Sequence, residues 1–281
     1  MTWKIVSDSG CDFQKIKNLA VATNFERVPL TIQVGNEIFT DDAELDIDEM
    51  MEKMYATSTA SKSACPSPDD YLKSFANADN IFVVTITGTL SGSNNSAQLA
   101  KKLYQEEHPN VNIHVIDSLS AGGEIDLIVH KLNHLIGQGL SFEEVAQAIT
   151  DYQEKTKLLF VLSKVDNLVK NGRLSKLLGT VVGLLNIRMV GEASSQGTLE
   201  LLQKARGHKK SLTAAFEELL KAGYAGGEII IAHRNNTKFC QQFSELVKEK
   251  YPKASITIIP TSGLCSFYAE EGGLLMGYEI E

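Results

Sequence analysis

Short hydrophobic runs alternate with longer segments of helical periodicity along most of the chain. In the first half, residues 4–6, 81–86 and 111–116 predict buried strands, and the Gly35-Asn36 pair between the hydrophobic segments 27–34 and 37–39 predicts a β-hairpin. Hydrophobic residues at helical spacing between these strands predict helices packed against a sheet. These are Ile47, Met50, Met51, Met54, Leu99, Ala100, Leu103 and Tyr104.

The second half has a different pattern, in which short hydrophobic strands are separated by a polar turn. A predicted helix over 142–155 leads into a hydrophobic strand at 158–162, and a polar turn through 194–197 separates two short strands of a predicted antiparallel hairpin. The remaining predicted elements are helices over 209–221 and 238–250 and strands over 228–232, 255–259 and 274–278.

This order of elements predicts an α/β protein with two lobes. Strands that alternate with helices indicate a mainly parallel sheet in the first lobe, whereas the hairpin indicates a mixed or antiparallel sheet in the second. A length of 281 residues is enough for two hydrophobic cores. We place the boundary after residue 156, which gives an N-terminal lobe of 1–156 and a C-terminal lobe of 157–281.

Composition narrows the class of partner. Hydrophobic residues make up 43% of the chain and charged residues 22%, which is typical of a folded globular protein. The formal net charge of −8 argues against a protein that neutralises nucleic-acid phosphates. We therefore expect a small molecule or another protein as the partner, and no nucleic acid.

The cysteines and the N-terminus bear on the compartment. Cys11, Cys65, Cys240 and Cys265 lie far apart and form no CxxC pair, which predicts reduced thiols and neither a zinc site nor a disulfide framework. The chain enters its first predicted strand almost at once, so we expect no signal peptide, and no apolar run approaches the roughly 20 residues of a membrane span. We expect a cytoplasmic protein with no integral membrane segment.

The richest polar cluster is the segment 85–97, where a strand turns through small and hydroxylated residues into a helix. Strand ends in open α/β sheets collect ligands, and free N–H groups at a helix start attract anions. Ser91 or Ser93 can supply a hydroxyl donor beside Thr87 and Gly92, so the segment suits a carboxylate or a phosphate. For either serine alone, simple capping of the helix is the preferred interpretation.

Two further polar clusters follow the same rule. In the segment 61–68, Ser67 and Pro68 are typical of a helix start, which leaves Ser63 without a capping role. Ser118 lies in the segment 115–123, where a strand again leads into a glycine-rich helix start. The spacings of GxGxxG and of the P-loop are both missing, so nucleotide binding is not predicted.

Candidate catalytic residues are few. Asp8 ends the first strand, but turn and capping roles are preferred for Asp8, Ser9 and Asp12. His130 and His134 are four residues apart without the HExxH pattern, and neither a GxSxG elbow nor a Ser-His-Asp arrangement is found. The sequence gives no support to hydrolase chemistry.

The ordered set of motifs resembles the DegV family of bacterial fatty-acid-binding proteins over nearly the whole chain. No single motif is specific, but their order is. The matching segments are Ile5-Val6-Ser7-Asp8-Ser9-Gly10-Cys11-Asp12, Val28-Pro29-Leu30, Ser63-Ala64-Cys65-Pro66-Ser67, Leu90-Ser91-Gly92-Ser93, Ile116-Asp117-Ser118, Gly172-Arg173-Leu174-Ser175, Leu185-Asn186-Ile187-Arg188-Met189 and Lys204-Ala205-Arg206-Gly207.

The resemblance implies a long-chain fatty acid held between the lobes, with no cofactor. By the same resemblance, Ser63 and Ser91 hold the lipid carboxylate, and some family members present the bound acid to the ATP-binding subunit of a fatty acid kinase. Arg173 and Arg206 resemble positions near the lobe junction, and we expect at least one at the rim of the cleft, facing a partner or a transferred phosphate. Cys265 stands where such members carry a histidine; we expect it to be an inert residue of the cavity.

Two other functions stay open alongside the carrier. One is an enzyme that transfers an acyl or phosphoryl group itself, with Asp8, His233 or Cys265 as the reactive group. The other is a regulatory protein whose lipid occupancy signals to a partner. The leading hypothesis for the site has Ser63 and Ser91 facing each other at the mouth of an apolar cavity, beside Thr87, Gly92, Ser93 and Ser118.

Overall fold

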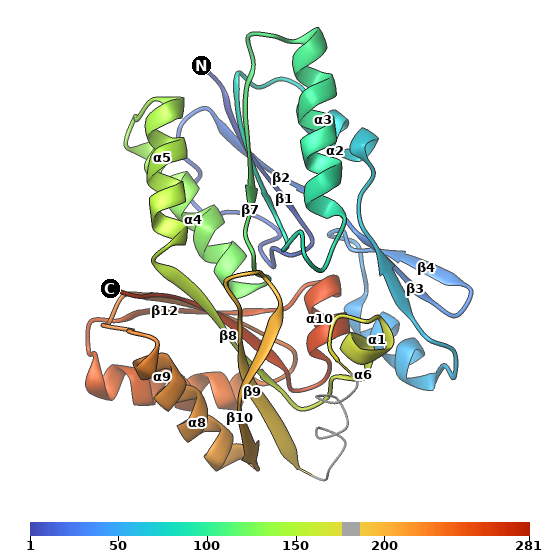
Figure 1. Ribbon diagram of the computed structural model, residues 1–281, viewed down its shortest axis with the longest axis vertical. Coiled ribbons are helices and arrows are strands. Elements are labelled where there is room, and N and C mark those ends of the chain that lie inside the picture. Colours follow the sequence, from blue (N-terminus) through green and yellow to red (C-terminus); the bar gives the residue numbers. More distant parts are fainter. Residues whose placement is uncertain (176–185) are drawn as a thin grey trace.

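The computed structural model describes residues 1–175 and 186–281. The chain forms two halves stacked along the long axis of the molecule, the first around a parallel sheet and the second around a mixed sheet (Figure 1). The predicted α/β class with two lobes is confirmed. Leu185, the first residue of the Leu-Asn-Ile-Arg-Met segment, lies outside the described residues.

Sheet A is parallel and has the strand order β2-β1-β6-β7. Successive side chains of a strand point to opposite faces, so Val6 packs toward α2 and α3 while Ile5 packs toward α4 and α5. Both faces are covered, and the two central strands, β1 and β6, are accordingly buried along nearly their whole length. The elements are β1 (Trp3–Asp8), β2 (Thr23–Val28), β6 (Asn80–Thr85), β7 (Asn112–Asp117), α2 (Pro68–Ser74), α3 (Ser93–Glu107), α4 (Gly123–Gly137) and α5 (Phe142–Gln153).

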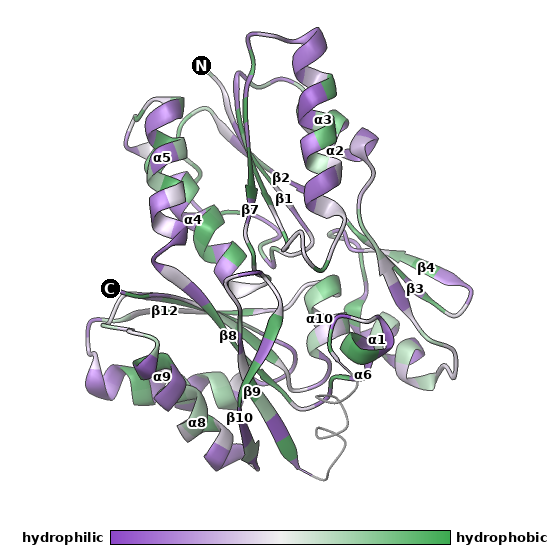
Figure 2. Cartoon of the chain, viewed as in Figure 1, coloured by the Kyte–Doolittle hydropathy of each residue, from purple (hydrophilic) through white to green (hydrophobic). Residues whose placement is uncertain are grey.

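Sheet C has the order β10-β9-β8-β13-β11-β12 and is antiparallel except for the β11–β12 pair. Helices α8 and α9 cover one face with their green, apolar sides (Figure 2), and the other face looks toward the first half. The elements are β8 (Thr156–Leu162), β9 (Ile187–Ala193), β10 (Leu199–Arg206), β11 (Glu228–His233), β12 (Ser255–Pro260), β13 (Leu274–Glu279), α8 (His208–Lys221) and α9 (Thr237–Lys250).

A small antiparallel sheet, β4-β3-β5, stands beside the junction of the two halves. Its hydrophobic side packs on α1 and on Phe267 of α10, so a helix from late in the chain joins strands from early in it. The elements are β3 (Thr31–Val34), β4 (Glu37–Thr40), β5 (Lys62–Ala64), α1 (Ile47–Ala56), α6 (Asp166–Lys170) and α10 (Gly263–Ala269).

One predicted strand is wrong. The segment 27–34 was expected to run continuously, but it divides into β2 of sheet A and β3 of the small sheet. Pro29 has no N–H to donate to a ladder, and the N–H of Leu30 bonds instead to the Ser9 hydroxyl at 2.9 Å. The break redirects the chain toward the junction. The predicted hairpin at Gly35-Asn36 is confirmed as β3–β4, with Gly35 at a positive φ of 59°.

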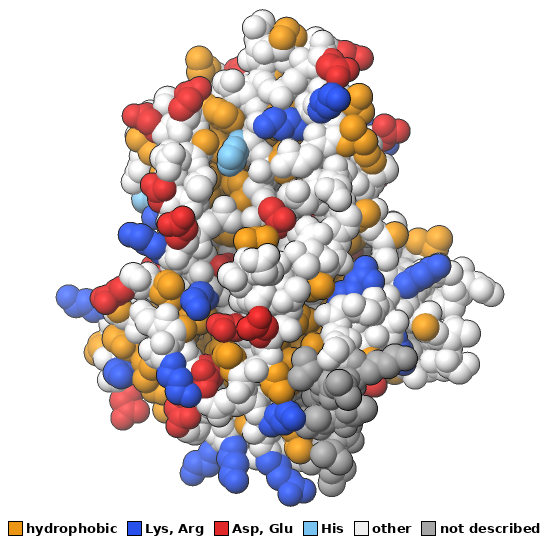
Figure 3. All heavy atoms as spheres, in the orientation of Figure 1, with side chains coloured by type: hydrophobic (Ala, Val, Ile, Leu, Met, Phe, Trp, Pro, Cys, Tyr) orange, Lys and Arg blue, Asp and Glu red, His pale blue; other side chains and the backbone are white. Residues whose placement is uncertain are grey.

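The two halves share α4, which packs on β1 and β6 of sheet A and on β11 and β13 of sheet C. The expected boundary after residue 156 falls after the first residue of β8, and the exact bounds of the two lobes stay a prediction. Along the two described stretches, no helix has both the length and the apolar character to cross a bilayer. On the face drawn in Figure 3, Lys and Arg side chains gather at the lower end and mix with acidic ones elsewhere.

Candidate ligand-binding pocket

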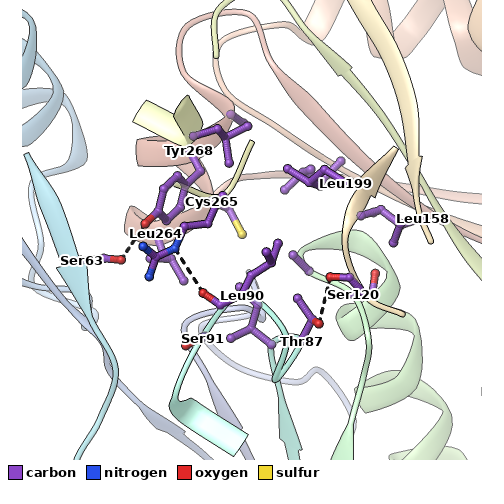
Figure 4. Close-up of a pocket in the computed structure, with 18 of the residues that line it drawn as sticks. Ser63, Thr87, Leu90, Ser91, Ser120, Leu158, Leu199, Leu264, Cys265 and Tyr268 are labelled. Carbon is purple, nitrogen blue, oxygen red and sulfur yellow. Dashed lines mark hydrogen bonds between the residues drawn. The ribbon is translucent and has the colours of Figure 1, made fainter. Parts of the chain in front are cut away.

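The candidate site is a cavity of about 310 Å³ between the two sheets. Its first-half wall comes from the loops that follow β6 and β7, at the carboxyl edge of the parallel sheet, where open α/β sheets place ligands. Its second-half wall comes from β8, β10, β13 and α10 (Figure 4). The cavity volume lies within the range of small-molecule sites.

The second-half wall is apolar because of strand alternation. Leu158, Phe160 and Leu162 of β8 point into the cavity, while Leu159 and Val161 between them belong to the core under α8 and α9. Other strands and helices complete the wall with residues of the same kind: Leu168, Leu199, Leu264 and Leu275. A long hydrocarbon group would meet hydrophobic side chains along this wall.

Hydroxyl groups gather at one end of the cavity. Ser63 on β5 forms a 2.8 Å hydrogen bond with the phenol of Tyr268 on α10, where either oxygen can be the donor (Figure 4). Ser91 lies in the loop before α3, and its hydroxyl accepts the N–H of Ser93 at 3.3 Å. Because a hydroxyl both accepts and donates, Ser91 keeps its own proton for a ligand. Ser63 and Ser91 line the same pocket; that their hydroxyls face each other stays a prediction.

Gly92 also lines the pocket, as the residue before the first turn of α3. A Cβ at this position would lie 3.0 Å from the thiol sulfur of Cys65, so the backbone of the loop passes close to β5. The lack of a side chain at Gly92 therefore lets this loop lie close to Cys65, the residue that follows β5.

Ser93 and Ser118 are outside the pocket lining. The Ser93 hydroxyl is buried and bonds to the Asp8 carboxylate and to the Tyr71 phenol. The Ser118 hydroxyl donates to the carbonyl of Ser120 and accepts its N–H, which fixes the turn after β7. Both side chains meet their hydrogen-bonding needs within the fold, and the structure does not bring them to the cavity.

Thr87 lines the pocket with its hydroxyl already engaged. It donates to the carbonyl of Gly197 at 3.0 Å, and Thr89 donates to the carbonyl of Gln196 at 2.6 Å. The turn of the β9–β10 hairpin thereby rests on the loop after β6. Thr87 joins the two halves at the edge of the cavity, a role that sequence reasoning missed.

The two arginines have different positions. Arg173 lines the pocket, where its guanidinium donates to the carbonyls of Leu90, at 3.2 Å, and of Asn171. Among the ion pairs formed within 1–175 and 186–281, none includes Arg173. Its positive charge therefore lies beside the hydroxyl-rich end, with no carboxylate partner in the described part of the chain. Arg206 is exposed on β10 and is not part of the lining.

Of the candidate reactive groups, Cys265 alone lines the cavity. Burial raises the pKa of its thiol well above the usual range, which keeps the thiol neutral and unreactive. Burial also raises the pKa of Asp8 to about 6, but that carboxylate faces the N–H groups of Gly10 and Ile86. His233 accepts the N–H of Asn236 outside the lining. In the described part of the chain, no three metal-binding side chains gather in one place.

The carboxylates of Asp12 and Asp41 bind the start of α10, although the sequence did not predict them as site residues. Asp41 accepts the N–H groups of Gly263 and Leu264 at 2.9 and 2.8 Å, and Asp12 accepts the N–H of Ser262 at 2.6 Å. Negative charge is stabilising at a helix start, so first-half residues fix a helix of the second half. Sequence reasoning placed Asp12 in a turn and had no signal for Asp41 or Tyr268, because their partners lie more than 200 residues away.

Comparison with known proteins agrees with this arrangement. The model of an uncharacterised protein family, DegV, matches residues 2–279. The chain belongs to the DegV family. A DegV domain-containing protein of Streptococcus gordonii is 83% identical over 280 residues, with complete coverage of both chains, and one of Streptococcus pneumoniae serotype 4 is 74% identical over 281 residues, with the same coverage.

Solved DegV structures extend the comparison to ligands. The fatty acid kinase (Fak) B3 protein of Streptococcus pneumoniae, loaded with linoleic acid, is 74% identical with a TM-score of 0.99, and coverage is 100% for both chains. A DegV family protein of Eubacterium eligens, loaded with heptadecanoic acid, is 39% identical with a TM-score of 0.96, again with 100% coverage of both. The expected family is thus confirmed, and these two relatives carry fatty acids.

Proposed function

We propose that the protein is a carrier that binds one long-chain fatty acid in the cavity between the sheets. The observation that carries the proposal is the division of the cavity into an apolar wall and a hydroxyl-rich end beside Arg173. The fatty acids in the Fak B3 protein and in the Eubacterium eligens relative support it. The carboxylate would bind at Ser63 and Ser91, and the tail would lie along Leu158, Phe160 and Leu162.

The tail and the head group of the lipid would contribute different amounts to the binding free energy. Burial of about 14 methylenes at about 0.8 kcal/mol each contributes on the order of 11 kcal/mol as an upper bound. A hydrogen bond to a charged head contributes about 1.5–3 kcal/mol. The apolar wall would therefore supply most of the affinity, while Ser63 and Ser91 would set the orientation of the bound lipid.

The carrier would present the carboxylate to the ATP-binding subunit of a fatty acid kinase. In that reaction a carboxylate oxygen attacks the γ-phosphorus of ATP, the bond to the β-phosphate oxygen breaks, and ADP leaves with its electron pair. The guanidinium of Arg173, which has no carboxylate partner among residues 1–175 and 186–281, is suited to stabilise the phosphate that forms at the polar end. The carrier itself needs no cofactor for this role, because the partner holds the nucleotide. The name of the Fak B3 relative supports the partnership.

We place the carrier in the cytoplasm and expect no nucleic-acid partner. The free thiols of Cys11, Cys65, Cys240 and Cys265 support a reducing compartment. The net charge of −8 supports a partner other than nucleic acid.

An enzyme that transfers the group itself is the second candidate, and the neutral, buried thiol of Cys265 at the cavity weighs against it. A lipid-responsive regulator is the third, and only the identity of the partner distinguishes it from the carrier. Native mass spectrometry of freshly purified protein, followed by extraction and identification of the released molecule, tests lipid binding. Protein free of lipid that takes up no added fatty acid would contradict the proposal.

The partnership has a separate test. Loaded protein is mixed with a fatty acid kinase ATP-binding subunit and ATP, and the acyl phosphate is trapped with hydroxylamine. We expect hydroxamate only when both proteins are present. Hydroxamate from this protein and ATP alone would favour the enzyme, and no hydroxamate from the complete mixture would favour the regulator.

A further inference from the structure

Helix α10 forms the part of the cavity wall nearest the hydroxyl-rich end. Four of its residues line the pocket: Leu264, Cys265, Tyr268 and Ala269. They fall at a spacing of three to four residues, so they share one face of the helix. Tyr268 is the only one of these four with a side-chain oxygen, and that oxygen bonds to Ser63.

The position of Tyr268 is fixed from both sides. At the start of α10, the carboxylates of Asp41 and Asp12 hold three consecutive N–H groups. Next to Tyr268, the ring of Phe267 is fully buried and meets the Tyr268 ring edge-on at a centroid distance of 4.8 Å. A phenol held in this way can keep one hydrogen-bond direction toward Ser63.

We propose that Tyr268 is a positioning residue for the fatty acid head group, acting through Ser63. The proposal rests on the function proposed above and adds a residue of the second half to the carboxylate site. An ionised carboxylate only accepts hydrogen bonds, so Ser63 must direct its single proton at the ligand. The Ser63 oxygen then accepts a hydrogen bond from the Tyr268 hydroxyl. The result is a chain of two hydrogen bonds, from the phenol to the Ser63 hydroxyl and from that hydroxyl to the carboxylate.

This chain of hydrogen bonds has a chemical consequence. A donor that itself accepts a hydrogen bond becomes a better donor, and the gain is larger toward a charged acceptor than toward a neutral one. Tyr268 therefore favours a free acid over its ester of equal chain length. It also links the head group to α10, so carboxylate binding is coupled to contact between the two halves.

The test uses delipidated protein and calorimetric titration with a long-chain fatty acid and its methyl ester. Tyr268→Phe removes the phenol oxygen and keeps the ring against Phe267. We expect roughly five- to tenfold weaker binding of the acid, the size of one lost hydrogen bond, and less than a twofold change for the ester. Equal weakening of acid and ester would indicate a packing role and overturn the proposal, as would unchanged binding of the acid.

Two more variants complete the test. Tyr251→Phe removes a tyrosine hydroxyl that bonds to the carbonyl of Tyr224, away from the cavity, and should bind the acid like the natural protein. In a Ser63→Ala background, Tyr268→Phe should weaken binding of the acid less than twofold, because the chain of hydrogen bonds is already broken at Ser63. If Tyr268→Phe still weakened binding of the acid five- to tenfold in that background, Tyr268 would not act through Ser63, and the proposal would be overturned. If the natural protein itself bound no fatty acid, the proposed function would fail first.

Discussion

Asp8 shows how a buried carboxylate can serve the pocket without touching it. It is fully buried at the end of β1 and accepts N–H groups from Gly10 and Ile86 and the hydroxyl of Ser93. These donors lower the pKa of Asp8, but burial outweighs them and raises it to about 6. The carboxylate thus ties together the loop after β1, the loop after β6 and the start of α3.

The raised pKa predicts a pH-dependent contribution of Asp8 to stability. Between pH 4 and about 6, folded Asp8 keeps a proton that the unfolded chain has lost, so the free energy of unfolding falls as pH rises through this window. A shift from 3.8 to about 6 corresponds to about 3 kcal/mol. Asp8→Asn cannot titrate, so the stability of the natural protein relative to this variant should fall by about that amount between pH 4 and 7.

Urea unfolding of both delipidated proteins at several pH values measures this difference. The lost acceptor in Asp8→Asn shifts the whole curve, but not its slope with pH. A stability difference that stays constant from pH 4 to 7 would contradict the raised pKa.

Ser63 and Ser91 carry the residue-scale prediction for binding. Replacement of both by Ala removes two proposed donors to the carboxylate and little packing, so the double variant should fold and bind fatty acid roughly a hundredfold more weakly, for a loss of about 3 kcal/mol. Ser244→Ala on α9 serves as the control, because its hydroxyl bonds within its own helix. Unchanged affinity in the double variant would refute the carboxylate assignment.

The sequence could indicate which loops form the site, but not which hydroxyls point into it. Ser91 and Ser93 are two residues apart in one loop, yet Ser93 turns inward to Asp8 while Ser91 lines the cavity. The direction depends on the buried carboxylate, which is 85 residues from Ser93 in the chain. Tyr268 was missed for a similar reason, because its partner Ser63 is 205 residues away.

At the scale of elements, the β9–β10 hairpin connects the halves across the edge of the cavity. Its turn has Gly197 at a φ of 72°, and a Cβ there would lie 2.1 Å from the hydroxyl oxygen of Thr87. Both the backbone conformation and the close approach therefore require glycine. The hairpin can only rest on the loop after β6 because this residue has no side chain.

Gly197→Ala should push the hairpin turn away from Thr87. We expect a loss of about 1–3 kcal/mol in the free energy of unfolding, and faster release of bound fatty acid because one wall of the cavity loosens. Gly139→Ala is a matched control, since Gly139 has a φ of 76° and nothing within 4 Å of a built Cβ. It should lose stability by backbone strain alone. Equal release rates in natural protein and Gly197→Ala would show that the contact between Gly197 and Thr87 does not slow the release of fatty acid.

Elements with a strong hydrophobic period were predictable, and those defined by partners elsewhere in the chain were not. Helices α8 and α9 begin within a residue of their predicted starts. Strand β5 has only Lys62, Ser63 and Ala64, which carry no strand pattern and pair with β3 through tertiary contact. Helix α10 was likewise not predictable from its own sequence, because Asp12 and Asp41 of the first half cap its start.

On the scale of the whole molecule, a ligand between the halves should stabilise both. A ligand that binds only the folded state adds about 2.7 kcal/mol to stability at a hundredfold excess over its dissociation constant. We therefore expect the melting temperature of delipidated protein to rise steadily with added long-chain fatty acid. The Ser63→Ala, Ser91→Ala double variant should show a smaller rise at each concentration. Equal melting temperatures with and without fatty acid would contradict a site between the halves.

The order of strands in sheet C bears on how the protein is made. The last strand of this chain, β13, lies between β8 and β11 and joins the two parts of the sheet. On the ribosome, β8 and β11 emerge well before the strand that must separate them. The cavity between the sheets is thus incomplete while β8 and β11 emerge, because Leu275 and all of α10 are made later. A ligand held by these residues can therefore enter the cavity only after α10 and β13 have been made.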